Sequence, residues 1–351
     1  MAHIAPPAAP ADPAAAAQAA QHVLQIGTGY ILSAALWAVT SLDVPGLLAA
    51  GPQPVAGLAR STGASEDALY RALRALTMAG IFDEPSPRTF ANNLASDLLR
   101  ADVPGNVRAM ALWMPDPFHF RIYAETLHAV KTGETVGERV VGMPVFDYFA
   151  RDQELSARFN DAMTNFSASV APAVLQAYDF AGIGTLVDIA GGHGMVLSSV
   201  LQRHPQMRGV LFDLPHVLDG ASPLLDQMGV RDRVTLETGD FFKAVPAGGD
   251  AYVMKHIIHD WDDEKATVIL KNIRTALACT PDGRVILIEG VIQAGSQPDL
   301  MKIIDLEMLL LPGGKERTAE QFTALLAGAG FELTRIVPTQ SPLSVIEGKV
   351  R

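Results

Sequence analysis

The stretch TLVDIAGGHG, from Thr185 to Gly194, decides the fold class of this 351-residue chain. Its first six residues form a short apolar run typical of a strand, and the glycines that follow allow the backbone to turn closely into a helix. Beyond it, strand-like runs alternate with helical stretches, which lie between the first six runs. The alternation predicts an α/β fold with a doubly wound, Rossmann-like sheet of seven strands. The runs are TLVDIA, GVLFD, RVTLE, AYVMK, RVILIEG, FELTRIV and LSVIEGK. Because only PTQSP joins the last two, we expect them to pair antiparallel.

Composition limits the classes of protein that remain. The chain has 27 Lys and Arg against 38 Asp and Glu, a net charge of -11, which argues against a nucleic-acid binder. A single cysteine, Cys279, excludes an internal disulfide framework and fits a reducing compartment. The N-terminus lacks the pattern of a signal peptide, and the apolar run YILSAALWAV is too short to span a bilayer. We therefore expect a cytoplasmic protein that binds no membrane.

The first third of the chain predicts a separate, mostly helical domain. Residues 1–17, rich in Pro and Ala, are typical of a disordered tail. Residues 18–105 begin with an almost wholly apolar helix, which must be buried, and a partner subunit is a reasonable cover. A helix with Ser65 as its N-cap and Gly80 at its end precedes the hairpin IFDEPSPRTFANN, which is the outline of a winged helix. The residues from Gly51 to Arg100 carry five basic and five acidic side chains, so we expect this module to pack rather than to bind DNA.

The remaining residues, 106–351, form the second predicted region. Its start, up to about residue 180, is helical and rich in aromatic and methionine side chains, most of which suit a core while some could line an apolar pocket.

Acidic residues gather where the predicted strands end, the edge at which open α/β sheets bind ligands. Asp188 and Asp213 end the first two strands, and Asp240 follows the third. Asp213 could accept hydrogen bonds from a ribose diol, and Asp240 could contact a base edge. These three acids, beside a glycine loop and without a phosphate-binding arginine, favour a cationic nucleoside such as S-adenosylmethionine. The alternative interpretation is that they only cap strand ends.

The segment HIIHDWDDE, from His256 to Glu264, allows three interpretations. Asp262 can cap the helix that follows, with Asp263 and Glu264 in its first turn. His256 and His259 could also ligate a metal, but they straddle a strand end and need not share a face. Proton transfer is favoured, because His259 lies in the loop beyond the strand and two carboxylates, Glu289 and Glu316, could hold its ring. His256 is expected in the core or behind His259.

Six segments in this order resemble the small-molecule O-methyltransferases of the plant caffeate and chalcone type, and their bacterial and acetylserotonin-type relatives. The resemblance extends from about residue 20 to the C-terminus, and its most specific parts are HDW and GGKERT. The segments are LVDIAGGHG, GVLFDLPHVL, GDFF, KHIIHDWDDE, RVILIEG and LPGGKERTAEQF.

The resemblance implies an S-adenosylmethionine-dependent O-methyltransferase of secondary metabolism, with S-adenosylhomocysteine as product and no metal. The winged-helix domain would form a homodimer. The acceptor would be a small hydroxylated aromatic or polyketide-like molecule, with His259 as general base and Glu289 and Glu316 positioning it. The cofactor-binding residues implied are Asp188, Gly191, Gly192, Gly194, Asp213, Leu214, Asp240, Phe241 and Lys255; those implied for the acceptor are Phe159, Met163, Phe166 and Met308.

Three positions depart from the family pattern. Ala190 replaces a common glycine, Phe166 stands where some plant members carry histidine, and the segment before Pro312 is one residue shorter. Two alternatives from other classes remain: a winged-helix transcriptional regulator that senses a ligand, and a relative that binds S-adenosylmethionine without transferring the methyl group.

Overall fold

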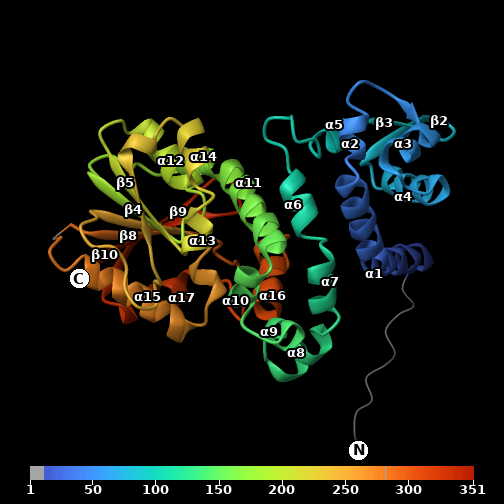
Figure 1. Cartoon of the computed structure of the whole chain (residues 1–351). Helices are drawn as coiled ribbons and strands as arrows, with labels where there is room; N and C mark the ends of the chain where they lie inside the picture. The colour runs from blue at the N-terminus through green and yellow to red at the C-terminus, as the bar shows by residue number, and fades with distance from the viewer. Residues whose placement is uncertain (1–11, 281) are drawn as a thin grey trace, which may run out of the picture. The chain divides into compact units, whose positions relative to one another are not determined.

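The computed structural model describes residues 12–280 and 282–351, and it divides into two compact units, the first ending at Asp116 and the second beginning at Pro117 (Figure 1). The predicted boundary at residue 105 precedes this division. The difference arises because helix α6 (Arg108–Trp113) packs against the first helix of the chain, α1 (Pro13–Ser41).

The first unit has the predicted winged-helix outline. A three-stranded antiparallel sheet, in the order β1-β3-β2, packs with the helices around one apolar core. Ser65 occupies the predicted N-cap position of α4 but makes no side-chain capping bond, while Gly80 turns the chain at a φ of +76° after the helix. The other elements are α2 (Val44–Leu47), β1 (Gln53–Pro54), α3 (Val55–Thr62), α4 (Glu66–Met78), β2 (Phe82–Ser86), β3 (Thr89–Asn92) and α5 (Leu94–Asp97).

Helix α1 begins earlier than the sequence suggested. Residues 1–11 of the predicted disordered tail lie outside the described residues, but residues 13–17 are helical. Asp12 accepts a hydrogen bond from the backbone N–H of Ala14, Pro13 stands at the first helical position, and the alanines that follow have the highest helix propensity. The expectation of disorder is therefore wrong for this part of the tail.

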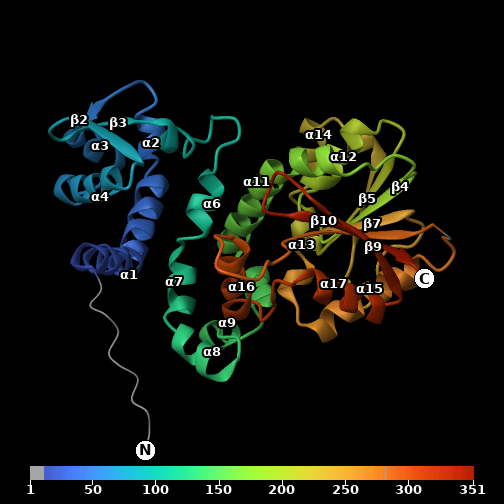
Figure 2. The ribbon, with the colours of Figure 1, turned by 180° about the vertical axis from the view of Figure 1, so that it is seen from behind.

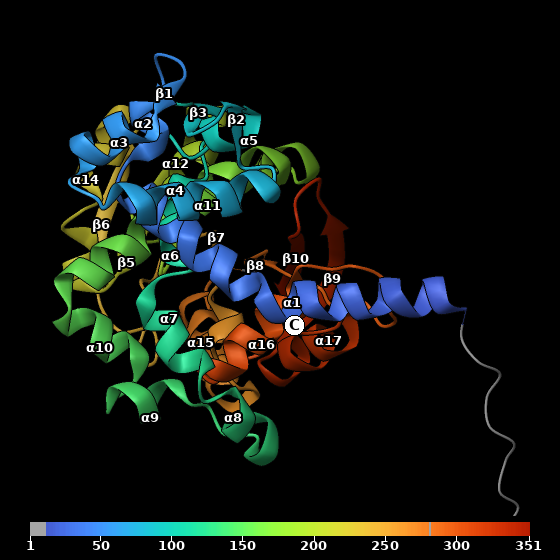
Figure 3. The same cartoon turned by 90° about the vertical axis from the view of Figure 1, so that its right-hand side faces the viewer.

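The N-terminal part of α1 carries an exposed apolar surface and extends beyond α4, against which the helix packs (Figure 3). By length and composition α1 could cross a membrane, and 11% of its most apolar window is buried. The exposed residues are Val23, Leu24, Ile26, Tyr30 and Ile31.

The second unit opens with the predicted helical region. A long helix, α11 (Gln153–Ala177), leads into the sheet, and Asp152 caps its first turn by accepting from the N–H of Leu155. The preceding helices are α7 (Pro117–Tyr123), α8 (Thr126–Thr132), α9 (Gly137–Val141) and α10 (Val145–Arg151).

The seven predicted strands form one sheet, in the order β6-β5-β4-β7-β8-β10-β9. The first five along the chain are parallel, and the last two pair antiparallel as expected. The strand order reverses between β4 and β7, which is the position where open α/β sheets bind ligands. The strands are β4 (Thr185–Ile189), β5 (Arg208–Asp213), β6 (Val234–Thr238), β7 (Ala251–Lys255), β8 (Arg284–Glu289), β9 (Phe331–Pro338) and β10 (Ser344–Val350).

Helices cover both faces of this sheet (Figures 1 and 2). Along β8 the side chains alternate strictly: Ile286 and Ile288 face the core under α11 and α12, whereas Val285 and Leu287 face the core under α15 and α17. The helices are α12 (Met195–Arg203), α13 (Pro215–Leu218), α14 (Ser222–Gln227), α15 (Asp263–Ala276), α16 (Met301–Leu310) and α17 (Ala319–Gly328), with 3-10 turns η1 (Arg231–Arg233) and η2 (Ile258–Asp260).

One expectation about the connections is wrong. Residues 239–250, between β6 and β7, form turns rather than a helix. Pro246 has no backbone N–H, and Gly248 adopts a φ of +91°, so a helix could not continue through them.

Candidate active site

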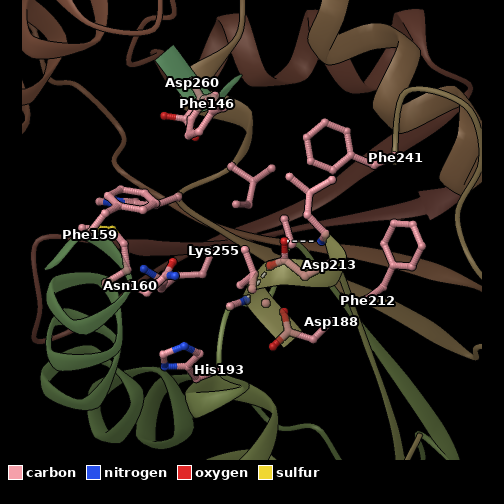
Figure 4. A pocket seen from close by; sticks show the side chains of 18 of the residues that line it. Phe146, Phe159, Asn160, Asp188, His193, Phe212, Asp213, Phe241, Lys255 and Asp260 are labelled. Carbon is pink, nitrogen blue, oxygen red and sulfur yellow. Dashed lines mark hydrogen bonds between the residues drawn. The ribbon is translucent and has the colours of Figure 1, made fainter. Parts of the chain in front are cut away.

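A cavity of about 340 Å³ lies at the carboxyl ends of β4, β5 and β7, with α10 and α11 on its other side (Figure 4). Of the predicted cofactor residues, Gly194 is not part of its wall. Gly194 instead starts α12 at a φ of +84°, packed against Leu211. Those that line the cavity are Asp188, Gly191, Gly192, Asp213, Leu214, Asp240, Phe241 and Lys255.

Asp213 joins the end of β5 to the glycine loop. Its carboxylate accepts hydrogen bonds from the N–H of Gly192 at 2.8 Å and from its neighbour Leu214 at 2.7 Å. Burial raises the pKa of Asp213, while these two N–H groups act in the opposite direction. Each carboxylate oxygen has a second lone pair, so the residue can still accept bonds from a ligand diol.

Asp188 gives the cavity wall a preference for cations. Its Oδ2 atom is buried and has no hydrogen-bond partner among the described residues. Burial raises its pKa to about 7, and the nearby Asp213 carboxylate adds to the effect. Gly191 leaves no room for a side chain beside this carboxylate, because a Cβ there would lie 2.6 Å from Asp188 Oδ2. A buried carboxyl with one unpartnered oxygen at a backbone cradle fits a ligand with sulfonium and ammonium groups, as S-adenosylmethionine has.

Lys255 ends β7 in the same wall. Burial lowers the pKa of its ammonium group to about 8, although the carboxylates of Glu289 and Asp188 favour the charged form. Its Nζ lies 5.0 Å from the ring centre of Phe166.

His259 lies in η2 and is 6% exposed. Its Nδ1 is 2.7 Å from Oε1 of Glu316, and its Nε2 is 3.6 Å from Oδ1 of Asp260. Burial by itself would lower the pKa of His259, but the carboxylates of Asp260, Glu316 and Glu289 outweigh it and raise the pKa to about 9. The buried carboxylate–imidazole pair is the arrangement that holds an imidazole in one orientation for proton transfer.

Glu289 acts on the backbone of the turn and not on the ring of His259. Its Oε1 accepts from the N–H groups of Ile257 and Ile258 at 3.1 and 2.9 Å. Burial raises its pKa to about 7. It thus fixes the turn that carries His259, and its charge acts on the imidazole from a distance.

His256 was expected in the core or behind His259, and this is wrong, because it lines the cavity. The chain leaves β7 with a left-handed φ of +53° at His256, a backbone region that side-chain-bearing residues rarely adopt and that strand patterning does not reveal. Its ring centre is 4.2 Å from that of His259, which stands behind it and is not in the cavity wall as the described residues define it.

The predicted acceptor residues divide into two groups. Phe159 and Met163, from α11, line the cavity, whereas Phe166 and Met308 do not. Phe166 packs against His256, with ring centres 5.1 Å apart, and Met308 is buried in α16.

Phe146, Phe149 and Trp261, which were not among the predicted acceptor residues, complete the cavity with Phe159. Phe146 and Trp261 have ring centres 5.5 Å apart, and those of Phe149 and Phe159 are 5.2 Å apart. All four line the cavity, next to Asn160 and Thr164 of α11. The sequence signal for Phe146 and Phe149 was only the general aromatic content of residues 106–180, while Trp261 belongs to the HDW motif.

One group of described residues could offer metal ligands: His256, His259 and Glu316, whose ligand atoms lie within 4.8 Å of one another. The 2.7 Å separation of His259 and Glu316 is that of a direct hydrogen bond. Two ligands about 2.1 Å from one ion would lie farther apart in a tetrahedral arrangement. The geometry therefore corresponds to a charge-assisted hydrogen bond.

Comparison with known proteins identifies the family of the chain. A family model described as an O-methyltransferase domain matches residues 123–332, and one described as an O-methyltransferase dimerisation domain matches residues 24–102. The chain is 40% identical over 327 residues to a phenazine O-methyltransferase of Lysobacter antibioticus, covering 93% of this chain and 95% of that protein.

Two further relatives are similar over nearly the whole chain. An 8-amino-8-demethylriboflavin N,N-dimethyltransferase of Streptomyces davaonensis is 35% identical, with 93% and 94% of the two chains covered. The solved structure of a mitomycin 7-O-methyltransferase superimposes with a TM-score of 0.90 at 36% identity, covering 97% of this chain and 100% of that one. The chain therefore belongs to the S-adenosylmethionine-dependent O-methyltransferases that carry an N-terminal dimerisation domain.

Proposed function

We propose that this enzyme methylates a hydroxyl group of a fused-ring aromatic or polyketide-like metabolite, with His259 as the general base and without a metal ion. The observation that carries the proposal is the buried hydrogen bond between His259 Nδ1 and Glu316, directly behind the cavity. A carboxylate at Nδ1 leaves Nε2 as the nitrogen that accepts a proton. Asp260, which lines the cavity, has its Oδ1 3.6 Å from Nε2.

The cofactor would be held by the strand-end residues of the cavity. Asp213 suits the ribose diol, Asp240 and Phe241 the adenine, and Asp188 the cationic end. When bound, S-adenosylmethionine supplies the sulfonium methyl group and leaves as S-adenosylhomocysteine. We assign residues 18–105 to dimerisation and 106–351 to the acceptor pocket and the catalytic domain.

In the proposed step, His259 takes the acceptor hydroxyl proton on Nε2 as the oxygen attacks the methyl carbon. With a pKa of about 9 in the free protein, only about 1% of the imidazole is neutral at pH 7. The nearby cation should lower this pKa and so prepare the base. General base catalysis is worth about 10²–10⁴-fold, and alignment of the reacting atoms supplies the remainder.

The class of acceptor follows from the cavity wall and from the relatives. Phe146, Phe149, Phe159, Met163 and Trp261 offer flat, apolar surface. The phenazine, mitomycin and riboflavin compounds in the names of the three relatives are all fused-ring molecules. One of these relatives is named as an N-methyltransferase, so aromatic amines belong in the same acceptor screen.

The test is product analysis with methyl-labelled S-adenosylmethionine and a panel of fused-ring phenols and amines. Labelled methyl ether, formed by the wild-type protein and lost in His259→Gln, is the expected result. Methyl transfer only to amines would overturn the hydroxyl assignment. Wild-type turnover by His259→Gln would overturn the base assignment. Sequence-selective DNA binding in a low-salt mobility-shift assay would favour the regulator alternative, and labelled donor retained without product would favour the binding-only alternative.

We also propose that the protein is a cytoplasmic homodimer that binds neither membrane nor nucleic acid. Four of the five exposed apolar residues of α1, Leu24, Ile26, Tyr30 and Ile31, lie within the part of the chain that matches a dimerisation domain. A second copy would remove this apolar face from water, and exposed contiguous apolar patches commonly mark surfaces where proteins associate.

A further inference from the structure

Arg317, in the GGKERT segment, has the largest fully buried side chain among the described residues, with 0% exposure. Its Nη1 donates to the carbonyl of Ile258 at 2.9 Å, and its Nη2 donates to that of Trp261 at 2.7 Å. Its Nε donates to Oδ1 of Asp263 at 3.0 Å. These three acceptors lie on both sides of His259 in the chain, so one guanidinium binds both ends of the turn that carries the imidazole.

The backbone of residues 314–317 also contacts this turn. The N–H of Lys315 donates to the carbonyl of His259 at 2.8 Å. A Cβ at Gly314 would lie 1.9 Å from that carbonyl oxygen, so only glycine permits the approach. The carbonyl of Arg317 accepts from the N–H of Ile292 at 3.0 Å, just beyond β8. The turn is therefore anchored through residues 314–317 to the edge of the central sheet.

We propose that Arg317 is a positioning residue of the methyl-transfer reaction, which holds the η2 turn so that His259 stays bonded to Glu316 next to the cavity wall formed by His256, Asp260 and Trp261. The proposal rests on the proposed role of His259 as the base. A guanidinium suits the task because it presents planar, forked donors and stays charged when buried. Lysine has a single ammonium group and cannot reach both carbonyls and Asp263 from one fixed plane.

The first test compares Arg317→Lys with Arg233→Lys. Arg233 also binds carbonyls, those of Leu201, His204 and Met207, but in the C-terminal part of α12 and just after it, and it is not part of the cavity wall. We expect Arg317→Lys to lower kcat by an order of magnitude or more, because small displacements of reacting groups are costly, while the Kd for S-adenosylhomocysteine changes by less than about twofold. Arg233→Lys should lower the Tm and leave kcat unchanged.

The second test uses the acidic first turn of α15. Asp263→Asn removes the carboxylate partner of Arg317, and Glu264→Gln removes the next acid along, for which no contact with Arg317 is seen. Because Asp263 is exposed, its variant should fold even if Arg317→Lys does not. We expect a lower kcat and a shifted acid limb in the pH profile for Asp263→Asn, and neither change for Glu264→Gln.

Amide hydrogen exchange separates the two proposals. Loosening of the turn in Arg317→Lys or Asp263→Asn should speed exchange of the N–H groups of residues 257–261, whatever the base is. If exchange, kcat and pH profile stayed at wild-type values in both variants while the Tm fell as in Arg233→Lys, Arg317 would be structural only. If amide exchange became faster in Arg317→Lys and Asp263→Asn but His259→Gln kept full turnover, the base assignment would be wrong. The conclusion that Arg317 orders the turn would still be supported.

Discussion

Nδ1 of His259 and Oε1 of Glu316 lie 2.7 Å apart in the buried interior, although 57 positions separate the two residues in the chain. The first belongs to the loop after β7 and the second to the loop before α17. The contact therefore forms only when both loops fold over the same edge of the sheet, and the orientation of the imidazole depends on that closure.

Replacement of His259 by glutamine should lower kcat by about 10²–10⁴-fold, because the general base is lost. Donor affinity should remain close to that of the wild type, since His259 is not in the cavity wall as the described residues define it. Quenching of tryptophan fluorescence, to which Trp261 in the wall contributes, measures the second quantity. His128→Gln, in α8, is the matched control and should change neither.

Replacement of Glu316 by glutamine should move the acid limb of kcat/KM to lower pH. The carboxylate of Glu316 is one of those that raise the pKa of His259 to about 9, and removing its charge lets the imidazole lose its proton more readily. The base would then be more often neutral but less well oriented, so the limb should shift while the plateau falls. Glu332→Gln, on the exposed edge of β9, should leave the profile as it is. An unmoved limb would mean that another group titrates there.

Thermal stability of the free protein should fall as pH rises from 6.5 to 8. The folded pKa of His259, about 9, exceeds the value near 6.5 expected when unfolded, so its contribution is complete below pH 6.5 and is lost toward pH 9. Asp188 and Glu289, with folded pKa values of about 7, act with the same sign, since their protonated forms are favoured in the folded state. His259→Gln should show a shallower fall of Tm over this range, and an equally steep fall would remove His259 from the explanation.

Replacement of Ala190 by glycine should stabilise the protein by up to about 1 kcal/mol. Ala190 has a φ of +52°, which costs a residue with a Cβ about 1–2 kcal/mol, while the greater freedom of glycine in the unfolded chain offsets part of the gain. Urea denaturation gives the free energy of unfolding. Ala266→Gly, in the buried face of α15, is the contrasting control and should cost about 1 kcal/mol.

Charged substitutions on α1 should dissociate the proposed homodimer. Leu24→Glu with Ile31→Glu places two carboxylates on the exposed apolar face, where burial against a second copy would strip them of water. Light scattering coupled to size exclusion should then report a monomer. Val268→Glu, on α15, should leave the mass at the dimer value. A dimer that persists in the α1 variant would place the interface elsewhere.

Sequence patterning predicted the sheet well because each strand is a short apolar run bounded by turn residues, as in TLVDIA and AYVMK. The family resemblance, carried by motifs such as HDW and GGKERT, named most of the strand-end residues that line the cavity. It could not predict how individual side chains are oriented. His256 faces the cavity because of one left-handed φ, and Phe166 packs on the Lys255 side chain outside it. Neither fact has a periodicity that could be read along the chain.

The start of α1 shows the opposite limit. Pro and Ala near a terminus suggested disorder, but one capping aspartate followed by helix-forming alanines is enough for a helix. Amino-acid composition alone does not show the order of residues that lets a helix begin at Pro13.

The protonation of Asp188 should make donor binding depend on pH. With a pKa of about 7, Asp188 is protonated in roughly half of the molecules near neutral pH, and a sulfonium bound beside it favours loss of that proton. Donor affinity would then increase with pH between 6 and 8, and calorimetric heats would vary with the ionisation enthalpy of the buffer.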